Sequence, residues 1–145
     1  MTVRTPTAGI CNSYLLESQQ GIHVWGTDSF KLALYDDTEV MDQTTTAYST
    51  TNEISGTGYT AGGFDLALGT GYPQLVGTQL VWDFDDISAN PASFSFRYGL
   101  LYNASKANRA FAVLDAGQIL TAIASFSITW PDPLVRPFIT LTRAG

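Results

Sequence analysis

The sequence predicts an all-β fold: an antiparallel β-sandwich of jelly-roll type, with about eight strands and one short N-terminal helix. Apolar and polar residues alternate with period two along most of the chain, as in half-buried strands. Clusters of Gly, Pro, Asn, Asp and Ser, such as "SANPAS" and "DAGQ", are predicted turns that separate the alternating segments at short intervals. The segments follow one another too closely for crossover helices, so neighbouring strands are expected to run antiparallel.

The first element is the only predicted helix, between Ile10 and Gln20. Tyr14, Leu15 and Leu16 lie there among polar residues, and Gly21 is placed to end the helix. The strands follow in order. Their segments are "DSFKLALYDD", a weaker "AYSTTNEI", "TAGGFDLAL", "LVGTQLVWDF", "FSFRYGLLY", "RAFAVLD", "TAIASFSITW" and "PFITLTR".

The composition predicts a single domain, residues 1–145, with a substantial core. Hydrophobic residues make up 45% of the chain and aromatic residues 12%. Charged residues make up only 14%, against roughly 25% in a typical soluble domain. Thr, Ser, Asn and Gln take much of their place. This composition fits a β-rich monomer and a protein in extensive contact with others equally well.

Charge and cysteine content exclude several classes of function. The net charge is −6 and the seven basic residues are scattered, so we expect no binding of nucleic acid. Cys11 is the only cysteine, which excludes an intramolecular disulfide and a metal site of four thiolates from one chain, and we expect it to be buried or half-buried. The chain start lacks the apolar core of a signal peptide, and "QILTAIASFSITW" is broken by Thr and Ser. We therefore expect no membrane segment and folding in a cytoplasm.

The glycine-rich stretch "ISGTGYTAGG" resembles a dinucleotide-binding turn, because Gly56, Gly58 and Ala61 fit the pattern G-x-G-x-x-A. That turn must follow a buried strand and open a helix. Here the preceding residues are polar, and Gly62 and Gly63 are poor helix formers. We therefore predict a structural turn with positive φ at its glycines, with Gly62 and Gly63 at a bulge or a close backbone approach, and no cofactor.

Candidate chemical groups are few. His23 is the only histidine and no nucleophile elbow is present, so we interpret it as a loop or packing residue and predict no catalytic residues. In "WDFDDIS", Asp83, Asp85 and Asp86 are candidate Ca²⁺ ligands. The alternatives are a solvated strand end, or a carboxylate pair in which one pKa is raised.

Three segments carry a resemblance to a known family. They are "DSFKLALYD" after a short helix, "EISGTGYTAGGFDL" after a run of Thr and Ser, and "FRYGLLYNASKANRAFAVLDAGQILTAIASFSITWP". From about residue 12 to residue 130 the chain resembles small bacteriophage virion structural proteins. The end departs from that pattern, because "WPDPLVRPFITLTRAG" has three prolines where the family has a glycine turn and a final strand.

The resemblance implies a non-enzymatic virion protein on the capsid surface, made in the host cytoplasm: a head decoration (cement) protein. Its partners would be the major capsid protein or other virion proteins, and it would form a homo-oligomer, with a trimer as the expected symmetric cluster. Two alternatives remain, a tail or head-fibre component and a carbohydrate-binding module on the virion, for which Trp25 and Tyr72 are the better exposed aromatic candidates. The helix and the proline-rich end are the candidate contact segments. The partner-contact candidates are Tyr14, Trp25, Pro131, Pro133 and Pro137.

Overall fold

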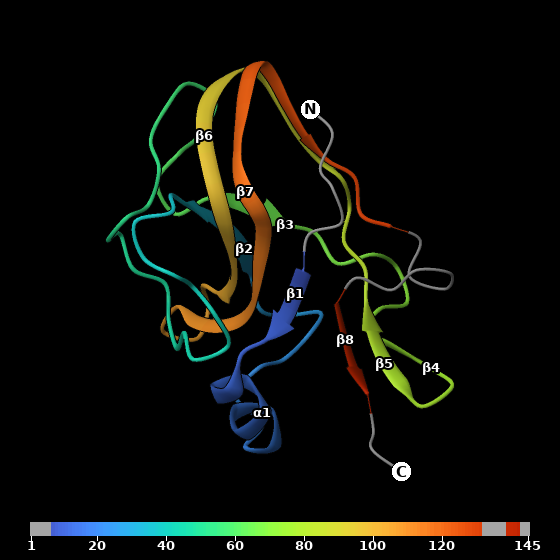
Figure 1. The fold of residues 1–145 in the computed structure, drawn as a ribbon. Coiled ribbons are helices and arrows are strands. Elements are labelled where there is room, and N and C mark those ends of the chain that lie inside the picture. Colours follow the sequence, from blue (N-terminus) through green and yellow to red (C-terminus); the bar gives the residue numbers. More distant parts are fainter. Residues whose placement is uncertain (1–6, 132–138, 143–145) are drawn as a thin grey trace.

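The computed structural model describes residues 7–131 and 139–142 (Figure 1). These residues form antiparallel sheets with one short helix, which confirms the predicted all-β class; the jelly-roll sandwich stays a prediction. A five-stranded sheet has the order β1-β7-β6-β2-β3, and a three-stranded sheet the order β4-β5-β8. The elements are β1 Thr7–Ile10, α1 Asn12–Gln19, β2 Phe30–Tyr35, β3 Phe64–Leu66, β4 Gln74–Val76, β5 Gln79–Trp82, β6 Ile87–Asn103, β7 Arg109–Ile128 and β8 Ile139–Thr142.

The hairpin of β6 and β7 dominates the larger sheet, with strands of 17 and 20 residues (Figure 1). β2 pairs with the last residues of β6, and β1 pairs with residues 112–115 of β7. The sheet is therefore broad near the hairpin turn. Farther from the turn, the hairpin continues largely as a two-stranded ribbon in the part of the chain that the structure describes.

Several predicted boundaries are wrong because the long strands absorb turn-forming residues as irregularities. The predicted turns "SANPAS" and "DAGQ" lie inside β6 and β7, where the pairing register shifts between Ala89 and Ala92 and between Phe96 and Tyr98. "RAFAVLD" and "TAIASFSITW" thus belong to one strand. "LVGTQLVWDF" instead contains two strands, β4 and β5, separated by Gly77 with φ 62°.

Two further differences concern the start of the chain and the loop before the glycine-rich stretch. "AYSTTNEI" forms no regular strand and contributes isolated bridges, at Ala47 to Arg109 and at Glu53 to Tyr35. β1 was not predicted, because four residues at the start of the chain carry too little alternation to be recognised. The predicted helix is confirmed at Asn12–Gln19, and Gly21 follows it with φ 71°.

The core lies on both faces of the larger sheet near the hairpin turn. One face carries the main aromatic cluster, which includes Phe30, Trp82 and Phe111. The other face carries a smaller cluster around Tyr35 and Tyr102. Burial on both faces explains why the end of β6 is continuously buried, whereas its first half alternates between buried and exposed residues.

Candidate functional site

Helix α1 has an inverted distribution of side chains. Its one charged residue, Glu17, is only 7% exposed, while Leu15 and Leu16 are 42% and 63% exposed. Surface helices normally bury apolar residues and expose charged ones. α1 therefore presents apolar side chains outward, and it is held to the domain by polar contacts of Glu17 as well as by the buried Tyr14.

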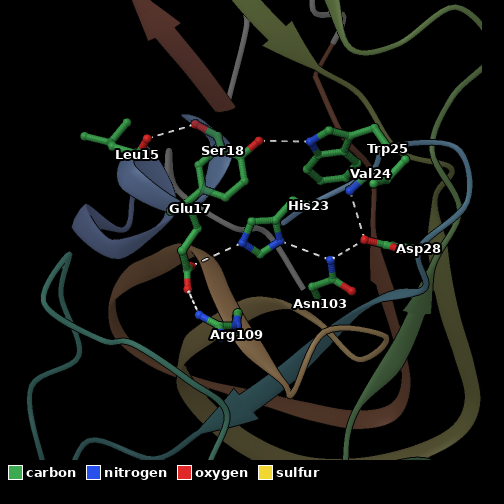
Figure 2. Close-up of polar contacts among 10 residues, drawn as sticks. Leu15, Glu17, Ser18, His23, Val24, Trp25, Asp28, Asn103 and Arg109 are labelled. Atoms are coloured by element: carbon green, nitrogen blue, oxygen red, sulfur yellow. Dashed lines mark hydrogen bonds and ion pairs between the residues drawn. The ribbon is translucent and has the colours of Figure 1, made fainter. Parts of the chain in front are cut away.

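Those contacts form a chain of hydrogen bonds and ion pairs beneath α1 (Figure 2). Arg109, at the start of β7, donates from Nη1 to Oε2 of Glu17 at 2.6 Å. Oε1 of Glu17 lies 3.2 Å from Nε2 of His23. Removing Arg109 would leave the buried Glu17 carboxylate without a cationic partner, so the ion pair of Glu17 with Arg109 helps to fix the position of the helix.

His23 is buried and engaged at both ring nitrogens. The amide Nδ2 of Asn103 lies 3.0 Å from Nδ1 of His23, and Oδ1 of Asn103 accepts a hydrogen bond from the backbone N–H of Ser105. The Asn103 amide is thereby oriented as a donor to Nδ1, so Nε2 carries the proton and donates it to Glu17. The interpretation of His23 as a packing histidine agrees with this position.

Asp28 continues the same network. One of its carboxylate oxygens accepts hydrogen bonds from Nδ2 of Asn103 at 2.8 Å and from the Val24 N–H at 2.9 Å, and Nζ of Lys106 lies 3.3 Å from the other. Burial alone would raise the pKa of Asp28, but these hydrogen bonds and the Lys106 ammonium lower it below its ordinary value. The loop after α1 is thereby tied to the hairpin turn.

Two of the partner-contact candidates, Tyr14 and Trp25, pack in the main aromatic cluster between α1 and the larger sheet. Tyr14 is buried against Phe111, so this candidate is corrected: it belongs to the core and does not face a partner. Its hydroxyl accepts a hydrogen bond from Nε1 of Trp25 at 2.9 Å. Trp25 is half-buried and stacks on Phe30 with ring centroids 3.8 Å apart.

Trp25 and Tyr72, far apart in the sequence, line one open cleft of about 370 Å³. Phe30 and Phe84 add aromatic surface, and Asp28, whose carboxylate is already bonded within the fold, also lines the cleft. Aromatic faces beside a polar group are typical of saccharide-binding sites, where the ring stacks on the sugar and the polar group fixes its orientation. The cleft therefore brings together the two aromatic residues that the sequence singled out for sugar contact.

The glycine-rich stretch is a structural turn. Gly58 has φ 85° and Gly63 has φ 92°, and a Cβ at Gly63 would collide with the carbonyl oxygen of Leu32 in β2. Gly56 and Gly62 also have positive φ. The predictions of positive φ and of a close backbone approach at Gly63 are thus confirmed.

A carboxylate that the sequence did not single out holds this turn. Oε1 of Glu53 accepts hydrogen bonds from the Tyr59 hydroxyl at 2.7 Å and the Gly62 N–H at 2.8 Å. Oε2 accepts one from the Tyr48 hydroxyl at 2.7 Å. The half-buried Glu53 is fully engaged within the fold, so it serves the turn and is not available to a ligand.

The remaining candidates do not form a site. Asp83, Asp85 and Asp86 lie between β5 and β6, and Oδ1 of Asp86 accepts the Trp130 N–H at 3.2 Å. Within residues 7–131 and 139–142, no group of three or more His, Cys, Asp or Glu side chains could hold a metal ion. Pro131 is exposed, whereas Pro133 and Pro137 lie outside the described residues.

Glu17, Glu53 and Asn103 were missed because no local pattern distinguishes them. The sequence pattern predicts Glu17 to be a solvent-facing helix residue and Asn103 to begin a loop. Only Asn103 carries a local sign of burial, because it directly follows the apolar run "GLLY". Their partners are distant in sequence, as with Asn103 and His23, and only the fold brings these side chains together.

Comparison with known proteins gives no relative: no protein-family model, no curated protein and no solved structure matches the chain. The single helix among the described residues is too short to span a membrane.

Proposed function

We propose that this protein is a non-enzymatic structural component of a bacteriophage particle, a head decoration (cement) protein that attaches to the capsid through α1. The observation that carries the proposal is the inverted helix, which exposes Leu15 and Leu16 while it buries Glu17. Exposed apolar side chains on a rigidly held element favour contact with another protein surface. The resemblance of three sequence segments to phage virion proteins supplies the kind of partner.

The way in which α1 is held suits such a contact. Glu17 binds Arg109 and His23, so the helix is fixed to the sheet before any partner arrives. A preorganised contact surface loses little conformational entropy on binding. Exposed leucines on a helix fixed in this way can therefore contribute most of their burial energy to affinity.

The mechanism would be the burial of additional surface across joints between capsid subunits. Each contact is small, but a symmetric shell repeats it many times, and a homo-oligomer engages several positions at once. The effective affinity then exceeds that of one contact. The low content of charged residues keeps the desolvation cost of such contacts small.

The experiment is to mix the purified protein with capsids of its phage that lack it, and to image them by cryo-electron microscopy. Regular density at symmetric positions, with α1 at the contact, supports the proposal. Leu16→Asp should abolish this density, because a carboxylate would be buried in the contact. Leu75→Asp is the matched control, since Leu75 is 72% exposed but lies on β4.

Bare shells with the wild-type protein would contradict the decoration role and favour the tail or head-fibre alternative. Binding that survives Leu16→Asp would show that another surface makes the contact.

A second candidate function is saccharide binding on the virion, favoured by the cleft that joins Trp25, Tyr72 and Asp28. Added host glycans should quench tryptophan fluorescence, and Tyr72→Ala should remove the effect without disturbing the Trp25 to Tyr14 hydrogen bond. Unchanged fluorescence across a glycan panel would argue against this function.

A further inference from the structure

The outer edge of β7 lacks a neighbouring strand over much of its length among the described residues. Within residues 7–131 and 139–142, β1 pairs with β7 from Ala112 to Asp115, and beyond that point only β6 pairs with β7 (Figure 1). Gly117 and Ala124 have φ values of 77° and 73° and interrupt the regular strand. Between them lies the short extended segment Gln118–Ile123.

The backbone of this segment offers hydrogen bonds outward. In β6, the Ser93 N–H donates to the Thr57 carbonyl and so points away from β7. Ser93 pairs with Ile123, which makes this a pair without mutual hydrogen bonds. The N–H and C=O of Ile123 must therefore face the open edge, and Thr121, two residues earlier, presents its backbone in the same direction.

The side chains of the segment form a symmetric pattern. Ile119 and Ile123 are 51% and 80% exposed, and each lies two residues from the exposed Thr121. Leu120 and Ala122 point inward and are buried. No charged residue occurs between Ala116 and Ile128, in a chain whose net charge is −6.

We propose that a second copy of the chain pairs with this edge, antiparallel, about a two-fold axis at Thr121. Thr121 then lies opposite its own counterpart, and Ile119 of each copy lies opposite Ile123 of the other. The pattern Ile-Leu-Thr-Ala-Ile is self-complementary about its centre, as a two-fold interface requires. The pairing covers the exposed isoleucines, and the uncharged edge lets two negatively charged chains approach.

This inference does not rest on the proposed function, because the dimer forms in free solution without a capsid. A failure of capsid binding would not count against the dimer. A failure of dimerisation would not count against binding of α1 to a capsid. The pairing is two-fold, so the expected state is a dimer, and the trimer implied by the resemblance would need a different contact.

The direct test is Thr121→Cys in the full chain. Opposed residues in a hydrogen-bonded antiparallel pair have Cα atoms about 5.5 Å apart, which is within the range of a disulfide. Mild oxidation should link most of the protein into a covalent dimer, while the buried Cys11 stays unreacted. Ser95→Cys is the matched control, because Ser95 is the exposed neighbour of Thr121 on β6 and lies away from the edge.

Equal cross-linking of the two variants would point to packing of sheet faces and overturn edge pairing. A lack of cross-linking in Thr121→Cys, with a monomer in sedimentation velocity at every concentration, would overturn the dimer itself.

A charge exchange tests the register. Ile123→Lys should raise the dimer dissociation constant about 10- to 30-fold, because the two-fold axis removes two isoleucine contacts at once. Ile119→Lys combined with Ile123→Glu should restore dimerisation, since the new lysine of one copy would face the new glutamate of the other. A double variant as weak as the single one contradicts the register. Circular dichroism verifies folding, which should persist because both side chains are exposed.

Discussion

Replacing Glu53 by glutamine tests what fixes the glycine-rich turn. Glu53 accepts three hydrogen bonds, from Tyr48, Tyr59 and the Gly62 N–H. Glutamine keeps the shape and one acceptor oxygen, but it removes the charge and replaces the other oxygen with a donor. The Tyr48 hydroxyl can rotate to accept from the new amide, so the main loss is the charge of the acceptor.

The expected magnitude follows from these three bonds. Hydrogen bonds to charged groups contribute about 1.5–3 kcal/mol each, against about 0.5–1.5 kcal/mol for neutral ones. A difference of about 1 kcal/mol per bond, reduced because Glu53 is only half-buried, gives a loss of about 2–3 kcal/mol in the free energy of unfolding. The melting temperature should fall by roughly 5–10 °C for a domain of this size.

The assay is urea unfolding followed by tryptophan fluorescence, together with thermal melts. Glu39→Gln is the control, because Glu39 is an exposed carboxylate in the loop after β2 and should change stability by less than about 0.5 kcal/mol. If Glu53→Gln were no more destabilising than this control, the turn would be held by its glycines alone. The Glu53 carboxylate would then make no measurable contribution to the stability of the turn.

Three further predictions concern the buried polar groups. Asn103→Ala should lower the free energy of unfolding by about 2–4 kcal/mol, because it leaves its buried partners unsatisfied; an unchanged urea midpoint would count against the network. Burial, with Asp42 and Glu17 nearby, raises the pKa of the Cys11 thiol to about 12, so at pH 8 a disulfide reagent should label it more than about a hundredfold slower than in the unfolded chain. Rapid labelling of folded protein would contradict this. Burial and Glu53 raise the pKa of Tyr48 to about 12. The unfolded chain releases this proton near pH 10, so the stabilisation is complete below pH 10 and is lost as the pH rises toward 12. Thermal melts across this range should show a fall that is shallower in Tyr48→Phe, and parallel curves would refute the assignment.

The fold class and the helix could be predicted because they depend on local patterns. Alternation identified the strand cores, such as "FSFRYGLLY", and Gly21 correctly marked the end of α1. The ends of the strands were harder to predict from the sequence. Pro91 and Gly117 normally signal turns, but in a long two-stranded ribbon they are accommodated where the pairing register shifts or φ is positive. Local chemistry does not reveal which of these outcomes a proline or glycine will take.

The candidate site was predicted only in part, for a different reason. Trp25 and Tyr72 were singled out as aromatic residues near turns, and the fold places both on one cleft. Tyr14 was misjudged because a helix pattern does not reveal which face packs inward. On α1 the polar Glu17 points inward, and its partner Arg109 lies 92 residues away in the sequence. Periodicity cannot anticipate an inversion that depends on a distant counter-charge.

The pairing of β1 with β7 also determines the order in which the fold can assemble. β6 and β7 are joined by a short loop, so their hairpin can close within microseconds of both strands being present. β1 is different, because Thr7 must meet Asp115, and closing a loop of that length carries a larger entropic cost. During synthesis β1 leaves the ribosome long before its partner exists. β1 therefore stays unpaired until β7 has been made, and its docking then adds an edge strand to the five-stranded sheet.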